Sequence, residues 1–185
     1  FLQHIAKSMK SKSGRAIVLF PHGVLFRQEE NEMRVALIKS GLLESVIGLG
    51  AGLFYNSPME AVIVTLRASR PKSQTDKVLF INAVSLVARE KATSYLKPEH
   101  QASILAMYNN FVDAEGLSRV VELTEIQQNN YSLAIPLYIA ADKNENTSVL
   151  NLSQASNIWY ESAKNSLQLA TELIVEIERN ASDDV

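Results

Sequence analysis

The sequence predicts an α/β fold in which parallel strands and one antiparallel hairpin strand share a sheet, followed by a mostly α-helical C-terminal region. Three apolar runs predict the strands, at residues 15–20, 43–49 and 60–66. The helix-patterned segment 28–40 joins the first two, and such a crossover is right-handed and leaves its strands parallel. Only residues 50–58 precede the third run, which fits a hairpin and is too short for a parallel crossover.

The first elements have recognisable ends. An N-terminal helix closed by Gly14 as a left-handed cap is predicted by apolar residues at helical spacing, namely Leu2, Ile5, Ala6 and Met9. The run 15–20 lacks alternation, which predicts a strand covered on both faces by helices and ended by Pro21. Segment 28–40 has acidic residues early and a lysine late, which suits the helix dipole, and Gly41 follows as its C-cap.

The remaining elements are predicted in chain order. Segment 84–97 shows no clear period, and Pro98 begins a helix that runs to about Phe111. The other expected elements are a strand at 77–83, a strand at 119–123, a helical turn at 124–128, an extended segment at 131–139, a linker at 142–148 and one long helix at 152–179. We therefore expect a partial sheet in residues 1–83, a mixed α/β extension in 84–141, and a linker with a long helix in 142–185.

Composition excludes several classes of protein. The 185 residues contain 46% hydrophobic residues and no cysteine, which excludes disulfides, thiolate zinc sites and cysteine nucleophiles. No apolar run approaches the roughly 20 residues that span a bilayer, and no signal peptide is visible, so we expect no membrane contact and a cytoplasmic location. The net charge of −2 predicts that any DNA contact is local. The chain starts at Phe1 inside an amphipathic pattern, which indicates a fragment.

Two loops are expected to form a site. The turn Pro21-His22-Gly23 and the loop 50–58 both leave from the carboxyl ends of predicted parallel strands, where open α/β sheets bind ligands. The alternative is that both are ordinary connections. No P-loop, GxSxG motif or metal-ligand cluster points to another enzyme class with a doubly wound sheet, and no metal site is expected.

Four segments, in order, carry a family resemblance: FLQHIAKSMKSKSGRAIVLFPHGVLFR, ESVIGLGAGLFYNSPMEAVIVTLR, KVLFINA and SRVVELTEIQQNNYSLAIPLYI. Together they resemble the second half of the Rossmann-like sheet of an adenine-N6 DNA methyltransferase, the modification subunit of a type I restriction–modification system. The resemblance implies an inserted antiparallel strand and DNA as substrate. It also implies S-adenosylmethionine as methyl donor of the complete protein, and specificity and restriction subunits as partners.

Two motifs of this family do not occur in the chain. The glycine-rich loop for the methyl donor and the Asn/Asp-Pro-Pro-Phe/Tyr tetrapeptide belong upstream of the quoted segments, so no catalytic residue is predicted here and the chain alone is not expected to methylate. Three positions also depart from the family pattern. Ala134 and Leu137 stand where Asn and Arg are usual, and Gly50 follows Leu49 where Pro is usual. These departures leave open a diverged or inactive paralogue.

The resemblance implies a target-base pocket at the hairpin loop. Phe54 best matches the family's aromatic residue that stacks on a flipped adenine, with Tyr55 next. Such stacking contributes roughly 1–3 kcal/mol per base. The alternative for Phe54 is a core aromatic that fills the hairpin end. Pro21, His22 and Asn56 are expected to line the site, although a loop histidine is often incidental and an asparagine often serves the turn.

Basic residues offer possible phosphate contacts. Arg27 is one candidate, although it could pair with Glu29 or Glu30 instead. The others belong to one basic stretch, which could equally be a solvated loop, and are Arg67, Arg70 and Lys72.

The long C-terminal helix is the second functional candidate. The resemblance implies packing against the specificity subunit, while packing on its own sheet and self-association are alternatives. A non-catalytic DNA-binding or assembly module derived from the same fold is the alternative function.

Overall fold

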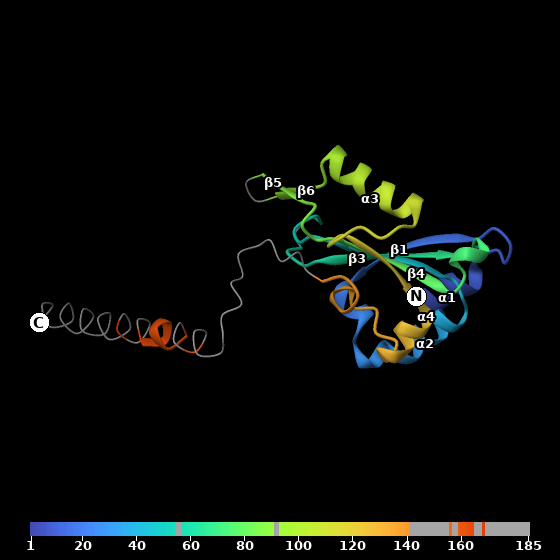
Figure 1. The fold of residues 1–185 in the computed structure, drawn as a ribbon, viewed down its shortest axis with the longest axis horizontal. Helices are drawn as coiled ribbons and strands as arrows, with labels where there is room; N and C mark the ends of the chain where they lie inside the picture. The colour runs from blue at the N-terminus through green and yellow to red at the C-terminus, as the bar shows by residue number, and fades with distance from the viewer. Residues whose placement is uncertain (55–56, 91–92, 141–155, 157–158, 165–167, 169–185) are drawn as a thin grey trace, which may run out of the picture. The chain divides into compact units, whose positions relative to one another are not determined.

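The computed structural model describes residues 1–54, 57–90 and 93–140, together with 156, 159–164 and 168. The chain divides into two compact units, Phe1–Asp142 and Lys143–Val185. Within the first unit, helices lie on both faces of one mixed sheet (Figure 1).

The sheet has five strands in the order β1-β3-β2-β4-β7. Their bounds are β1 Arg15–Pro21, β2 Leu43–Leu49, β3 Ala61–Arg67, β4 Lys77–Ala83 and β7 Ser118–Glu122. β3 pairs antiparallel with both β1 and β2, while β2 and β4 pair parallel, so β1, β2 and β4 share one direction. The predicted hairpin is confirmed, and β3 lies between the two parallel strands that precede it. β7 closes the far edge antiparallel to β4.

Helices cover the two faces unequally. Helices α1 (Leu2–Ser8), α2 (Asn31–Lys39) and α4 (Leu123–Gln128) contribute to one core, in which Leu37, Ile38 and Phe80 are buried. Helix α3 (Pro98–Asn110) lies on the opposite face, where Met107 packs with Leu79 and Ile81 (Figure 1). Every residue of β2 is buried, because this strand is covered on both faces.

β1 is not covered on both faces, and that prediction is wrong. Its residues alternate between exposed and half-buried, and Ile17 and Leu19 are 76% and 48% exposed. β1 is the edge strand of the sheet, and Ala16, Val18 and Phe20 pack against the core shared with α1 and α2. Ile17 and Leu19, on its other face, belong to neither buried core.

Two further predictions need correction. Helix α1 ends at Ser8 with an extended Met9, and Gly14 is not left-handed, because a turn separates it from the helix. A Cβ on Gly14 would lie 2.5 Å from the Lys10 carbonyl oxygen, so close approach of the backbone requires the glycine there. Gly41, in contrast, has φ +70° and caps α2 as predicted.

Segment 131–139 is not extended. Tyr131 adopts φ 57°, and Ile135–Leu137 forms a short 3₁₀ helix, η4, with Pro136 in its first turn. The backbone N–H of Leu133 donates to the Leu25 carbonyl at 2.8 Å, which ties this segment to the loop after β1 instead of to the sheet. Segment 84–97 contains a small hairpin of β5 (Ala88–Glu90) and β6 (Thr93–Tyr95).

Three other 3₁₀ helices complete the first unit: η1 (His22–Leu25), η2 (Gln28–Glu30) and η3 (Lys72–Gln74). The predicted linker at 142–148 and most of the helix predicted at 152–179 lie outside the described residues. Residues 159–164 are helical, and Trp159 and Tyr160 are 72% and 62% exposed. Within the described part of the chain, no helix combines the length and apolar character needed to cross a membrane.

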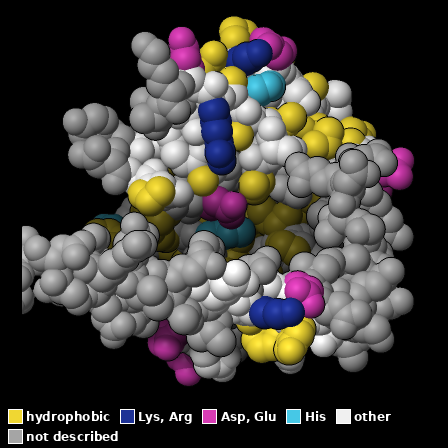
Figure 2. All heavy atoms as spheres, turned by 90° about the vertical axis from the view of Figure 1, so that its left-hand side faces the viewer, with side chains coloured by type: hydrophobic (Ala, Val, Ile, Leu, Met, Phe, Trp, Pro, Cys, Tyr) yellow, Lys and Arg dark blue, Asp and Glu magenta, His cyan; other side chains and the backbone are white. Residues whose placement is uncertain are grey.

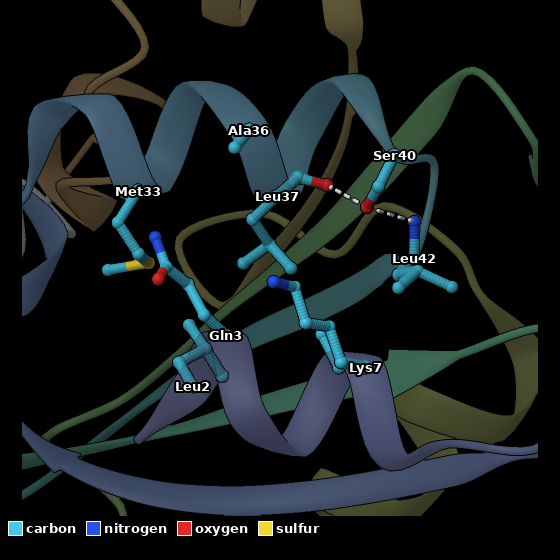
Figure 3. A pocket seen from close by; sticks show the side chains of 9 residues that line it. Leu2, Gln3, Lys7, Met33, Ala36, Leu37, Ser40 and Leu42 are labelled. Carbon is cyan, nitrogen blue, oxygen red and sulfur yellow. Dashed lines mark hydrogen bonds between the residues drawn. The ribbon is translucent and has the colours of Figure 1, made fainter.

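A groove of about 340 Å³ runs between α1 and α2 (Figure 3). Its walls are mostly aliphatic, with Leu2 from α1 facing Met33 and Leu37 from α2. Lys7 is the one ionisable residue of its lining, so the groove offers no acid–base pair. The site predicted from the sequence lies elsewhere, at the carboxyl ends of the parallel strands.

Candidate functional site

The carboxyl ends of β1 and β2 meet at one residue of β3. Ala61, which begins β3, pairs with Pro21 on one side and with Leu49 on the other. The turn after β1 and the loop after β2 therefore leave from neighbouring positions. Figure 2 views the molecule from the left-hand side of Figure 1 and shows histidine, acidic and hydrophobic side chains near one another on that side.

His22 and Glu60 lie side by side at this edge. Nδ1 of His22 lies 3.4 Å from a carboxylate oxygen of Glu60. The His22 and Phe26 rings are arranged edge to face, with their centroids 6.3 Å apart. Nε2 of His22 is shielded from solvent and has no hydrogen-bond partner among the described residues. A carboxylate beside Nδ1 favours a hydrogen on that nitrogen and fixes the orientation of the ring.

Glu60 did not emerge from sequence reasoning, although a signal was available. It is the first residue of the third predicted strand, at 60–66. The pairing of β1 with β3 places it beside His22, but the sequence predicted only the pairing of β2 with β3. A hairpin strand that inserts between two parallel strands has two neighbours, and sequence spacing reveals one of them.

Phe54 lies in a tight turn of the loop between β2 and β3. The backbone N–H of Ser57 donates to the Phe54 carbonyl at 3.1 Å, and the Phe54 side chain is 36% exposed. Gly52, at φ +77°, accepts a hydrogen bond from the Ser94 N–H of β6, so the small hairpin supports this loop. Phe54 is absent from both buried cores. Tyr55 and Asn56 lie outside the described residues.

A buried arginine holds the loop that follows β1. Arg34 of α2 is only 3% exposed, and its guanidinium donates to the carbonyls of Val24, Arg27 and Tyr131 at 3.2, 2.7 and 3.2 Å. Burial lowers the pKa of Arg34, and the nearby charge of Glu30 opposes that shift. Sequence reasoning missed this residue. Its signal was an arginine among the apolar residues of a predicted helix.

Arg27 packs against the turn instead of forming the expected local ion pair. In the described part of the chain, no salt bridge joins it to Glu29 or Glu30. Its guanidinium covers Gly23, where an added Cβ would lie 2.5 Å from the Arg27 Nε. Gly23 is therefore the residue that lets Arg27 lie across the turn.

The other three candidate phosphate contacts lie at the opposite end of the sheet. Arg67 is bound to Glu44 at 3.1 Å. Arg70 donates to the carbonyls of Leu43 and Lys77, and burial lowers its pKa. Lys72 lies in η3 of the same loop. The structure thus separates these residues from Pro21 and His22, which it brings together with Glu60.

The described residues of this edge offer an aromatic ring, an imidazole and a carboxylate. Phe54 offers an aromatic surface, and His22 with Glu60 offers a fixed imidazole and a carboxylate. No group of three or more metal-ligating His, Asp or Glu side chains occurs within the described residues. The chemistry available here is stacking and hydrogen bonding.

Known proteins are similar to this chain in sequence and fold. Residues 1–147 match the family described as N-6 DNA Methylase. The type I restriction enzyme MjaVIII methylase subunit of Methanocaldococcus jannaschii is 33% identical over 130 residues, covering 68% of this chain and 22% of that protein. The MpnII methylase subunit of Mycoplasma pneumoniae is 29% identical over 157 residues, covering 83% and 28%.

A solved structure agrees with these relatives. The crystal structure of the type I restriction–modification methyltransferase subunit of Streptococcus thermophilus matches with a TM-score of 0.70 and 31% identity, covering 75% of this chain and 29% of that one. The chain thus spans less than a third of the length of each of these three proteins. The predicted resemblance and fold are confirmed, and the chain belongs to the N-6 DNA methylase family.

Proposed function

We propose that this chain is part of an adenine-N6 DNA methyltransferase, the modification subunit of a type I restriction–modification system, and that it forms the target-adenine side of the active site. The observation that carries the proposal is the position of Phe54. It lies at the carboxyl edge of the sheet, partly exposed, in a turn braced by the Ser57 N–H. The family match over residues 1–147 supplies the context for that position.

Phe54 acts as a stacking wall for an adenine that has left the DNA duplex. A flipped base loses its stacking neighbours, and an aromatic side chain restores roughly 1–3 kcal/mol of that interaction. Pro21 and His22 line the same edge, and we expect Tyr55 to be a second stacking residue and Asn56 a further lining residue. Arg27, packed across the turn at Gly23, remains the candidate phosphate contact on this side.

The methyl donor of the complete protein is S-adenosylmethionine, and its site lies outside this chain. A donor of this kind is cradled by a glycine-rich loop that opens a helix. The turn after β1 leads into η1 through Pro21, and the loop after β2 returns directly as β3. Neither connection provides that cradle, so no step through the donor is assigned to residues of this chain.

The second unit contributes to assembly. We assign the C-terminal helix to contact with the specificity subunit, which recognises the DNA sequence, in a complex that also holds the restriction subunit. The exposed aromatic rings of Trp159 and Tyr160 support a role in contacts with another chain or in self-association. With DNA as its substrate, the complex is expected to act in the cytoplasm.

Methyl transfer by the complete methylase, assembled with its specificity subunit, tests the proposal. Wild type is expected to form N6-methyladenine at one sequence, and Phe54→Ala is expected to lower kcat/KM about 5- to 150-fold, which corresponds to the stacking term of about 1–3 kcal/mol. Phe54→Tyr keeps an aromatic face and serves as the matched control. Unchanged kinetics in Phe54→Ala would remove the stacking role, and absence of N6-methyladenine with wild type would remove the enzyme assignment.

A non-catalytic module derived from the same fold is the competing function. Leu137 is 52% exposed at a position where the family pattern has an arginine, which favours divergence of this surface. The complete protein decides between the two. An intact Asn/Asp-Pro-Pro-Phe/Tyr tetrapeptide and glycine-rich loop support the enzyme, and their loss supports the module.

A further inference from the structure

Basic side chains gather in a pocket at the end of the sheet opposite Phe54. β1 begins at Arg15, which pairs with Arg67 at the end of β3. The loop before β1 (dark blue) and the loop after β3 (green) meet at this end, away from β5 and β6 (Figure 1). Between them is a polar pocket of about 270 Å³. It is lined by Lys12, Ser13, Gly14, Arg15, Arg67 and Ser69, which we call the amino-edge pocket.

The lining has the chemistry of an anion site. Lys12, Arg15 and Arg67 supply three cations, and Ser13 and Ser69 add two hydroxyl groups, while no carboxylate lines this pocket. The chain as a whole carries a net charge of −2, so this concentration of positive charge is local. Guanidinium, ammonium and hydroxyl groups together match the oxygens of a phosphate group.

Arg67 is held in place before any ligand arrives. Its Nη1 donates to Glu44 Oε1 at 3.1 Å, and the Arg67 side chain stays 30% exposed. The Glu44 carboxylate is buried, with 4% of its side chain exposed, and also accepts the Tyr108 hydroxyl at 2.6 Å. Glu44 therefore orients the guanidinium without lining the pocket itself.

The backbone of the two loops is also joined. The Ala68 N–H donates to the Gly14 carbonyl at 2.9 Å, so the loop before β1 and the loop after β3 are hydrogen-bonded to each other. The Gly14 N–H donates to the Lys10 carbonyl at 2.7 Å, which folds the first loop tightly. Both contacts reduce the ordering that binding would require.

We propose that the amino-edge pocket binds a phosphate group, independently of the target-base site. It differs from the contacts expected from sequence alone, because Arg67 joins Lys12 and Arg15 instead of Arg70 and Lys72. Arg70 is occupied with backbone carbonyls. The phosphate can belong to a nucleic-acid backbone or to a free phosphate compound, and the two sources are distinguished below.

Inorganic phosphate is the first probe. Amide resonances of the isotope-labelled chain are followed at constant ionic strength while phosphate is raised to tens of millimolar. Saturable shifts are expected at Ser13, Gly14 and Ser69. Lys12→Gln and Arg15→Gln should each raise the dissociation constant for phosphate about 5- to 10-fold. Lys39→Gln makes the same charge change at an exposed site on α2 and should change that constant less than twofold. Arg67 is not substituted, because its loss would strand buried Glu44.

DNA is the second probe, used with the complete methylase and its specificity subunit. If the phosphate is that of a nucleic-acid backbone, Lys12→Gln should reduce the slope of log affinity against log salt by about 1. An unchanged slope with weakened inorganic phosphate binding assigns the pocket to a free phosphate compound.

Two results would overturn the proposal. One is the absence of saturable phosphate shifts at the pocket amides, even if the DNA slope falls. The other is phosphate binding that Lys12→Gln and Arg15→Gln leave intact.

Discussion

Replacing Glu44 with glutamine keeps the shape of the side chain but removes a buried negative charge. The carboxylate uses one oxygen for Arg67 at 3.1 Å and the other for the Tyr108 hydroxyl at 2.6 Å. A glutamine has one acceptor oxygen, so if Arg67 keeps that oxygen, the Tyr108 hydroxyl can no longer donate to this side chain and can only accept from its amide. The network also explains why the pKa of Tyr108 is raised, first by burial and then by its hydrogen bond to Glu44.

The expected loss of stability follows from the burial of each partner. Two unit charges at about 4 Å interact by roughly 4 kcal/mol at an effective dielectric constant near 20. Breaking a fully buried pair costs about 3–5 kcal/mol, but the Arg67 side chain is 30% exposed and stays hydrated after the change. We therefore expect Glu44→Gln to lower the free energy of unfolding by about 2–3 kcal/mol.

Urea denaturation at pH 7 measures this loss, with Glu99→Gln as the matched control. Glu99 pairs with Lys97 at 3.8 Å and its side chain is 66% exposed, so its substitution should change stability by less than about 0.5 kcal/mol. A double-mutant cycle with Tyr108→Phe should give a coupling of about 1 kcal/mol. If Glu44→Gln is as mild as Glu99→Gln, the network does not stabilise the sheet as argued.

Three further predictions concern other buried or strained positions. Arg34→Met should lower the free energy of unfolding by about 3–4 kcal/mol and the melting temperature by roughly 10 °C, because three carbonyls lose their donor. Arg34→Lys should recover part of this loss in calorimetry. Wild-type melting temperatures for both variants would contradict the stabilising role of Arg34. Gly41→Ala should lower the free energy of unfolding in urea by about 1 kcal/mol, because φ is +70° and a Cβ meets no atom within 4 Å. Gly41→Asn should lower it less, because asparagine tolerates the left-handed conformation better than alanine. Equal losses for the two variants would point to a steric clash instead. Burial raises the pKa of Tyr138 to about 12, above its unfolded value near 10. The protonated Tyr138 therefore contributes about 1–2 kcal/mol to the free energy of unfolding below pH 10, and this contribution is lost as pH rises toward 12. In Tyr138→Phe, the free energy of unfolding should accordingly fall less steeply between pH 9.5 and 11.

The apolar pattern of the sequence predicted burial correctly for a strand that helices cover on both faces. β2 is mostly apolar, and all its residues are buried, Glu44 and Ser45 included. β1 carries the apolar run 16–20, yet Ile17 is 76% exposed. The difference lies in where each strand sits in the sheet, which depends on the insertion of β3, and local sequence does not encode that neighbour.

The candidate site was predictable only in part, for a related reason. Pro21, His22 and Phe54 stand at strand ends that the sequence marks with turn residues, so their common edge followed from topology. Glu60 and Arg34 required contacts between segments far apart in the chain. Arg34 reaches Tyr131 across 97 positions, which a periodic pattern cannot reveal.

The surroundings of Gly48 and of Gly50, the latter a departure from the family pattern, show what the resemblance could not supply. A Cβ on Gly48 would lie 2.7 Å from Ile135 Cδ1, and one on Gly50 would lie 2.6 Å from the Val84 carbonyl oxygen. The end of β2 is therefore packed against η4 and the segment after β4. Gly50, which stands where the family usually has proline, is fixed in this chain by that close approach.

Base flipping tests the central claim most directly. The complete methylase, with its specificity subunit, is mixed with DNA that carries 2-aminopurine at the target adenine, and the fluorescence of the extruded base is recorded. If Phe54 is the stacking wall, wild type and Phe54→Tyr should hold the base in a stacked environment. With Phe54→Ala, each extruded base should be more fluorescent because no aromatic ring stacks on it, while the population of the flipped state should be about 5- to 150-fold lower. Identical fluorescence and occupancy for wild type and Phe54→Ala would contradict the assignment of this edge to the target adenine.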